Sequence, residues 1–261
     1  MIIDGNKIAE EMLRELRKQF VPQQEFAAVV VGDDPASLSF LRQKEKTAQS
    51  LGIRFKLYQF EAKIAQSLLI EKIAAISGDP NVGGMIVQLP LPAKFDRVAV
   101  LNAIGIQKDV DVLNGETTKI LAPAAGALAR VLDTIKYNVA DKHVVVVGSG
   151  LLVGRPIVNW LITRARQVTV LNRGGYDPHI IRTADLVVAG TGVPRLIRGE
   201  HLKLGAAVID FGYGRDESDQ LAGDVDAKSV QKVAGYITPT PGGMGPIVVA
   251  QLFANFYRLT S

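Results

Sequence analysis

No cysteine occurs in this sequence of 261 residues, and histidine occurs only three times. Without cysteine, the chain forms no disulfide, has no thiolate nucleophile and binds no zinc through thiolates. His143, His179 and His201 lie far apart and lack the spacing of metal ligands, so we expect no metal site.

A strong charge of either sign is also missing. The net charge is +4 at pH 7, and the Lys and Arg residues are scattered without a long basic block. Few aromatic residues accompany them, so we expect no nucleic-acid partner. A mildly positive field suits an anionic small molecule instead.

No segment has the pattern of a signal peptide or a membrane helix. The first residues, MIIDGNKIAEEML, lack a basic start followed by an apolar core. The longest uncharged stretch, between Lys232 and Arg258, contains TPTPGGMGP, which interrupts any single membrane-spanning helix. We therefore expect a cytoplasmic protein with no membrane partner.

Short apolar runs alternate with helical patterns along the chain. Runs rich in Val, Ile and Ala predict strands buried on both faces, as in parallel sheets. They are FAAVVVG, GMIVQL, HVVVVG, QVTVL, DLVVAG and AAVIDFG. Helical patterns cover 6–19, 36–50 and 66–77. This alternation predicts an α/β fold built from βαβ units.

The composition changes near residues 112–125, where VLNGETTKILAPAAG has no clear strand period. We place a hinge there, and the chain is long enough for two domains. We expect residues 1–120 plus 245–261 to form a substrate domain and residues 121–244 to form a Rossmann-type dinucleotide-binding domain. The apolar C-terminal helix is expected to return to the first domain.

The segment HVVVVGSGLLVGRPIVNWL, residues 143–161, has the order strand, glycine turn, helix. Gly148, Gly150 and Gly154 are spaced one residue wider than the common dinucleotide fingerprint. Gly148 permits a tight turn, and Gly150 lets the backbone approach a pyrophosphate. The helix start then offers N–H groups to phosphates, and Pro156 suits its first turn. We predict a dinucleotide site; the alternative is a tight turn without a ligand.

The end of the next strand indicates which dinucleotide is bound. A carboxylate there binds the ribose 2′-OH of NAD. QVTVL is instead followed by Asn172 and Arg173, which favours NADP. The alternative is that Arg173 is a solvated surface charge.

Lys44 and Gln88 are candidates for chemistry. Phe40 and Lys44 lie four positions apart on a predicted helix and share a face. A lysine that is desolvated on such a face has a lowered pKa and can act as a base or polarise a carbonyl-like carbon. Gln88 ends the apolar run GMIVQLPLP, where an amide needs a partner, and Lys44 is one candidate partner. The alternative is that Lys44 belongs to a solvated face.

The pattern KDVDVLNGE adds Asp109 and Asp111. Two carboxylates separated by one residue point the same way in an extended segment, where they suit the donor edge of a heteroaromatic ring. The alternative is turn chemistry, in which Asp is common.

Taken together, VVGDDPAS, GMIVQLPLP, KDVD, VVGSGLLVGRP, ADLVVAGTGVP, GAAVIDFG, GDVD and ITPTPGGMGP occur in one order along the chain. They resemble the bifunctional methylenetetrahydrofolate dehydrogenase/methenyltetrahydrofolate cyclohydrolase family over nearly the whole chain. The resemblance implies a two-domain homodimer with a folate cleft between the domains. It also implies NADP-linked oxidation of 5,10-methylenetetrahydrofolate and hydrolysis of the methenyl product to 10-formyltetrahydrofolate.

The resemblance also implies roles for individual residues. Lys44 is the catalytic lysine, Gln88 hydrogen-bonds it, and Asp111 holds the pterin ring. The substrate contacts implied are Phe40, Asp109, Pro241, Gly242 and Gly243. The cofactor contacts implied are Gly148, Ser149, Gly150, Val153, Gly154, Arg155, Pro156, Asn172, Arg173 and Gly192.

Some positions depart from the family pattern around the folate site. Phe40 stands where the family has tyrosine, and Val112 stands where it has glycine. Pro123 and Ala124 replace a threonine and a proline, and Val248 replaces a threonine.

Three hypotheses follow. The chain is an active dehydrogenase/cyclohydrolase, or a dehydrogenase with weakened cyclohydrolase activity or an altered pterin substrate, or a non-catalytic paralogue that binds NADP or folate. Retention of Lys44, Gln88 and Asp111 favours the first.

Overall fold

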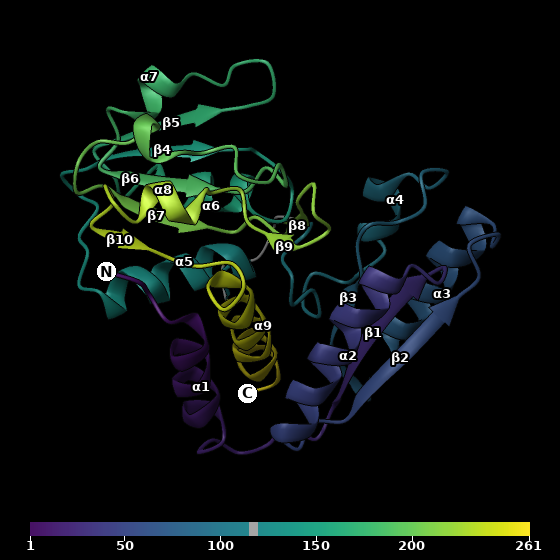
Figure 1. Ribbon diagram of the computed structural model, residues 1–261. Helices are drawn as coiled ribbons and strands as arrows, with labels where there is room; N and C mark the ends of the chain where they lie inside the picture. The colour runs from purple at the N-terminus through teal and green to yellow at the C-terminus, as the bar shows by residue number, and fades with distance from the viewer. Residues whose placement is uncertain (115–119) are drawn as a thin grey trace. The chain divides into compact units, whose positions relative to one another are not determined.

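The computed structural model describes residues 1–114 and 120–261. Within them the chain forms two compact units (Figure 1). One comprises Met1–Glu10 and Ala124–Val248 and is called here the five-stranded unit. The other comprises Glu11–Pro123 and Val249–Ser261 and is called the three-stranded unit. Each is described by itself.

The three-stranded unit contains a parallel sheet with the strand order β2-β1-β3. Its strands are β1 (Glu25–Val31), β2 (Phe55–Phe60) and β3 (Val82–Val87). Its helices include α2 (Pro35–Ser50), α3 (Gln66–Gly78) and α4 (Arg97–Leu101). The central strand β1 is buried from its second residue on, which is why it reads as a continuous apolar run. The edge strand β2 is partly exposed along its whole length, so it contains no apolar run and was not predicted from the sequence.

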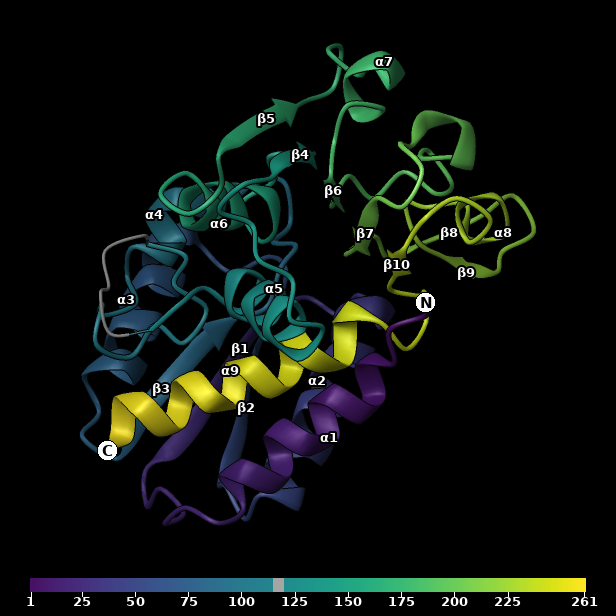
Figure 2. The ribbon, with the colours of Figure 1, turned by 90° about the vertical axis from the view of Figure 1, so that its left-hand side faces the viewer.

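The C-terminal helix α9 (Met244–Thr260) packs against this sheet from Val249 on. The ring of Phe26 on β1 lies 5.3 Å from that of Phe253 and 5.2 Å from that of Phe256. Figure 2 shows α9 crossing the sheet. The prediction that the C-terminal helix returns to the first domain is therefore confirmed.

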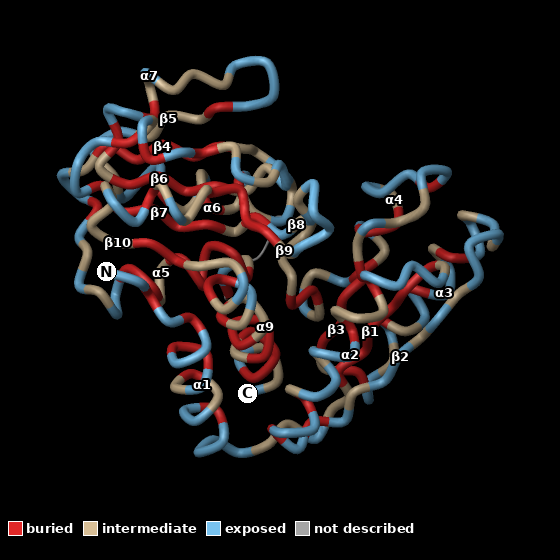
Figure 3. The backbone as a smooth tube through the Cα atoms, in the orientation of Figure 1, coloured by how far each residue is buried: buried red, intermediate tan, exposed pale blue. Residues whose placement is uncertain are grey.

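The five-stranded unit is a parallel sheet in the order β10-β7-β6-β4-β5. Its strands are β4 (His143–Val147), β5 (Gln167–Leu171), β6 (Leu186–Ala189), β7 (Ala207–Asp210) and β10 (Tyr236–Ile237). Its helical segments include α5 (Pro123–Thr134), α6 (Gly154–Leu161), α7 (Pro178–Ile181), the short 3-10 helix η1 (Gly199–His201) and α8 (Ala227–Val230). A small hairpin joins β8 (Gly214–Arg215) to β9 (Leu221–Ala222). Strands β4, β6 and β7 are fully buried (Figure 3), and the predicted α/β class with parallel sheets is confirmed.

The N-terminus groups with the five-stranded unit, whereas the sequence placed it with residues up to 120. Ile2 bridges Ile237 at the edge of the sheet, and the backbone N–H of Gly5 donates to the carbonyl of Gly242. Helix α1 (Gly5–Leu16) begins there and reaches the core of the other unit with Leu16. Local sequence patterns do not reveal a bridge between positions so far apart.

Within the described ranges, no helix is long and apolar enough to cross a membrane.

Candidate active site

Helix α2 positions Lys44 and Phe40. The helix starts at Pro35 behind an Asp34 cap, whose carboxylate accepts the backbone N–H of Ser37 at 2.7 Å. Phe40 and Lys44 lie about one turn apart and are both half-buried. Lys44 Nζ donates a hydrogen bond to Gln88 Oε1 at 2.8 Å. The predicted helix therefore brings the lysine to the amide that the sequence singled out.

Gln88 follows directly after β3 and is held in one orientation. Its backbone N–H donates to the carbonyl of Val29, which extends the sheet by one residue. Its side-chain Nε2 donates to the carbonyl of Leu89 at 2.7 Å. Because Nε2 faces that carbonyl, Oε1 faces Lys44. The polar residue at the end of an apolar run is thus explained by partners on both sides of its amide.

Asp109 and Asp111 differ from the extended arrangement that was expected. The segment is a turn, and Asp109 is fully buried. Its carboxylate accepts the backbone N–H groups of Asp111 at 3.2 Å, Leu113 at 2.8 Å and Asn114 at 3.1 Å. The expectation that both carboxylates point the same way is wrong, because Asp109 turns inward and organises the turn. Asp111 is the carboxylate of the pair that stays partly accessible, although most of its surface is buried.

Electrostatics couple Asp111 to Lys44. Burial lowers the pKa of Lys44, and the charge of Asp111 opposes that change. Burial raises the pKa of Asp111 to about 6; the Lys44 cation acts against this and the Asp109 charge adds to it. A lysine with a lowered pKa near an ionisable carboxylate is suited to proton transfer.

Val112, one of the departures from the family pattern, has a left-handed backbone with φ of 56°. A β-branched residue rarely adopts this conformation, which costs about 1–2 kcal/mol for an L-residue. The strain lies directly beside Asp111. Among the other departures, Pro123 opens α5, Ala124 is buried, and Val248 lies half-buried on α9.

The glycine turn lies in the five-stranded unit, between β4 and α6. Gly148 has φ of 95°, and its N–H donates to the carbonyl of Leu171 at the end of β5. A side chain at Gly148 would collide with the carbonyl of Gly190, and one at Gly154 would collide with the carbonyl of Gly148. A side chain at Gly150 would instead enter open space. The turn thus has a closed inner side and an open outer side, which fits a pyrophosphate at the helix start.

The other predicted cofactor residues surround this turn. Val153 precedes α6 and packs against Gly190, and Asn172 and Arg173 are exposed just after β5. Gly192, with φ of 72°, follows β6. Of the remaining three, Ser149 lies in the turn, and Arg155 and Pro156 lie in the first turn of α6.

The sequence did not predict that Asp210 and Asp224 form a pair of buried carboxylates. Asp224 accepts the backbone N–H groups of Thr191 at 2.5 Å and Gly192 at 3.3 Å. Asp210 accepts N–H groups from Gly212, Asp224 and Val225. Burial raises the pKa of Asp210 to about 7, and the charge of Asp224 adds to this. Asp224 belongs to the GDVD motif noted in the sequence. Through the N–H groups of Thr191 and Gly192, its carboxylate holds the loop after β6.

Pro241, Gly242 and Gly243 lie in the five-stranded unit. Gly5 packs so closely on Gly243 that a side chain at Gly5 would collide with its carbonyl. Lys44, Gln88 and Asp111 belong to the three-stranded unit. The predicted substrate residues are therefore divided between the two units.

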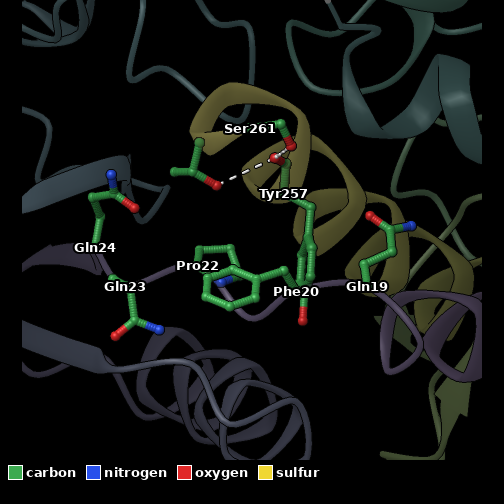
Figure 4. Close-up of a pocket in the computed structure, with 8 residues that line it drawn as sticks. Gln19, Phe20, Pro22, Gln23, Gln24, Tyr257 and Ser261 are labelled. Carbon is green, nitrogen blue, oxygen red and sulfur yellow. Dashed lines mark hydrogen bonds between the residues drawn. The ribbon is translucent and has the colours of Figure 1, made fainter.

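A hollow on the three-stranded unit contains none of the predicted site residues (Figure 4). It is lined by Gln19, Phe20, Pro22, Gln23, Gln24, Tyr257, Thr260 and Ser261. Among residues 1–114 and 120–261, no group of three His, Cys, Asp or Glu side chains is arranged to hold a metal ion.

A dinucleotide-binding unit, together with a unit that carries a lysine, an amide and a carboxylate, defines a nicotinamide-dependent dehydrogenase. Comparison with known proteins is more specific. Residues 3–111 match the catalytic domain of tetrahydrofolate dehydrogenase/cyclohydrolase, and residues 122–261 match its NAD(P)-binding domain. The chain belongs to the tetrahydrofolate dehydrogenase/cyclohydrolase family, which confirms the resemblance seen in its motifs.

Relatives and solved structures agree over nearly the whole length. The bifunctional protein FolD of Geobacillus thermodenitrificans is 37% identical over 97% of this chain and 95% of its own. That of Halothermothrix orenii is 38% identical over the same shares. The Campylobacter jejuni FolD structure has a TM-score of 0.94 at 31% identity, covering 100% of this chain and 98% of that one. The Trypanosoma brucei FolD structure, solved with NADP and an inhibitor, has a TM-score of 0.93 at 31% identity, covering 100% and 97%.

Proposed function

We propose that the protein oxidises 5,10-methylenetetrahydrofolate with NADP and hydrolyses the 5,10-methenyl product to 10-formyltetrahydrofolate, within one-carbon metabolism. The observation that carries this proposal is the Lys44–Gln88 hydrogen bond of 2.8 Å, electrostatically coupled to Asp111. Family membership supports the reaction, and the intact cluster supports turnover over a purely binding role.

In this proposal Asp111 binds the pterin. Its ionised carboxylate accepts hydrogen bonds from the N–H donors of the ring and orients the one-carbon unit. Above its pKa of about 6 the carboxylate is charged, so it also stabilises the methenyl cation. Phe40 supplies an aromatic face for the aminobenzoyl ring.

Lys44 moves the proton in the hydrolytic step. Its lowered pKa favours the uncharged amine, which accepts a proton from the water that attacks the methenyl carbon. Gln88 keeps the amine aimed in one direction. The Gly148–Gly150 turn, Ser149 and the start of α6 would hold the NADP pyrophosphate, and Arg173 its 2′-phosphate. Bound NADP supplies the hydride acceptor.

A second candidate is a dehydrogenase with weakened cyclohydrolase activity. Phe40 favours it, because the residue one helical turn before Lys44 carries no hydroxyl. Loss of a hydrogen-bonding group beside the base affects proton transfer more than hydride transfer.

The test is to incubate the protein with 5,10-methylenetetrahydrofolate and NADP, with NAD in parallel. NADPH and the methenyl species are followed separately. NADPH formation without accumulation of the methenyl species, at a rate above the enzyme-free decay, supports both activities. Accumulation supports the second candidate, and no reduction of either cofactor refutes the proposal. Lys44→Ala should abolish turnover but keep ligand affinity.

Arg173→Ala tests the cofactor preference, with Arg166→Ala as the matched control. Both arginines are exposed and flank β5, but Arg166 lies at its opposite end. We expect Arg173→Ala to raise the KM for NADP about tenfold, as for loss of a charged hydrogen bond, and to leave the KM for NAD unchanged. Equal effects of both variants would remove Arg173 from the cofactor site.

The homodimer, implied by the family resemblance, and the cytoplasmic location, expected from the sequence pattern, are both proposals. Light scattering of the purified protein tests the first, and cell fractionation tests the second.

A further inference from the structure

We propose that Asn255, on α9, is a positioning residue that fixes the peptide bond before Asp111 and thereby aims the Asp111 carboxylate. The inference rests on the proposed role of Asp111 in pterin binding. It assigns a function to the C-terminal helix beyond its packing in the core.

Asn255 is fully buried, and its side-chain amide is directed at the turn. Nδ2 donates to the carbonyl of Val110 at 2.9 Å and to the carbonyl of Leu121 at 2.8 Å. Oδ1 accepts Nε2 of Gln251, one turn earlier on α9, at 3.0 Å. Both amide hydrogens are therefore used on loop carbonyls, and Gln251 sets the orientation of the amide. A buried amide in an apolar helix is costly unless it is paired in this way.

The bond to Val110 acts directly on Asp111. The carbonyl of Val110 and the N–H of Asp111 belong to one planar peptide group. Asn255 holds the carbonyl edge of that plane, and Asp109 Oδ1 accepts the N–H edge at 3.2 Å. A plane held at both edges does not rotate about the chain. Because the Cα of Asp111 is attached to this plane, the direction of its side chain is restricted as well.

The side chain of Val110 prevents the plane from tilting. Val110 is fully buried, and a side chain added at Gly84 on β3 would collide with both Val110 and Phe256. Val110 and Phe256, the residue next to Asn255, thus both pack on β3 at Gly84. The turn is fixed by packing on one side and by hydrogen bonds on the other, as a precise binding group requires.

Releasing the peptide group should change both the geometry and the acidity of Asp111. The charged groups acting on this carboxylate are Lys44 from α2 and Asp109 from its own turn. Burial is the main cause of its raised pKa. A carboxylate that swings toward water loses that effect, so its pKa falls toward the ordinary value.

The test compares Asn255→Ala with two variants on the same helix. Phe253→Leu reduces packing in the core without removing a bond to the turn. Tyr257→Phe removes a buried hydroxyl that has no hydrogen-bond partner within residues 1–114 and 120–261. We expect Asn255→Ala to lower the dehydrogenase kcat by about 10- to 100-fold, as for a misplaced binding group, and to raise the KM for the folate. The KM for NADP should stay constant, and the acid limb of kcat/KM should move to lower pH.

Equal activity losses and an unchanged acid limb for Asn255→Ala and Phe253→Leu would overturn the proposal, because Asn255 would then be structural only. If Asn255→Ala does not fold, Gln251→Met is used instead. It keeps Asn255 and removes the bond that orients it. We expect a loss of about threefold, as for one neutral hydrogen bond, and an acid-limb change of the same sign. An unchanged Gln251→Met profile would also overturn the proposal.

A carboxyl titration by 13C NMR, assigned with Asp111→Asn, gives a readout that needs no turnover. We expect Asn255→Ala to lower the pKa of Asp111, and an unaltered pKa would refute the inference. Absence of turnover in the wild-type protein would instead refute the proposed function, so the two failures are distinguishable.

Discussion

Replacing Gln88 by Met removes the acceptor from Lys44 while nearly preserving side-chain volume. The lost contact joins Lys44 Nζ to Gln88 Oε1 at 2.8 Å. A hydrogen bond to a charged group contributes about 1.5–3 kcal/mol. Because this bond favours the charged amine, its loss adds to the effect of burial and lowers the pKa of Lys44 further.

The assay is the pH dependence of cyclohydrolase kcat. Under the proposed mechanism the rate rises with pH as Lys44 loses its proton, so the rising limb should move to lower pH. The plateau should fall about 10- to 100-fold, because the amine is no longer aimed. Gln59→Met is the matched control, since Gln59 is exposed on β2 and its amide donates to the carbonyl of Gly32. A limb that stays in place or moves to higher pH would refute the assignment of Lys44 as the base.

Three further predictions concern other parts of the molecule. Phe40→Tyr should raise the cyclohydrolase rate about three- to tenfold, as for one added hydrogen bond, and should change the dehydrogenase rate by less than about twofold. Equal changes in both rates would argue against a role of this position in hydrolysis. Val112→Gly should raise the free energy of unfolding by about 0.5–1 kcal/mol in urea titrations, because it relieves the backbone strain of a residue with φ of 56°. Lys136→Gly, at a residue with φ of 53°, is the control. A loss of stability in Val112→Gly alone would show that the contacts of the Val112 side chain outweigh the strain. Because the pKa of Asp210 is raised to about 7, the native state keeps a proton that the unfolded state releases. The free energy of unfolding should therefore fall as pH rises from about 4 to 7, and Asp210→Asn should flatten this slope. An identical slope in the variant would exclude Asp210 as the source.

Much of the fold followed from local patterns. Strands β1 and β4 are buried on both faces, so they appear as unbroken apolar runs. The glycine turn was recognisable because close backbone contacts at Gly148 and Gly154 exclude side chains. The edge strand β2 has no such pattern, because one of its edges and much of its surface face water.

The site was only partly predictable. The one-turn spacing of Phe40 and Lys44 follows from helical geometry. The hydrogen bond from Lys44 to Gln88 joins positions far apart in sequence. The residue pattern alone was also compatible with a Lys44 side chain that faces solvent. Spacing also misled the prediction for Asp109, since the segment is a turn and the Asp109 carboxylate binds the N–H groups of that turn.

The sequence by itself determined the α/β class, the dinucleotide turn and the family, because these depend on short-range periodicity and on motifs of adjacent residues. The tertiary structure alone decided which partners meet across the chain. It turned Asp109 inward, joined Met1–Glu10 to the five-stranded unit and placed Asn255 against the carbonyl of Val110. Such contacts form only when distant segments pack together, and the residue types involved fit many other partners equally well.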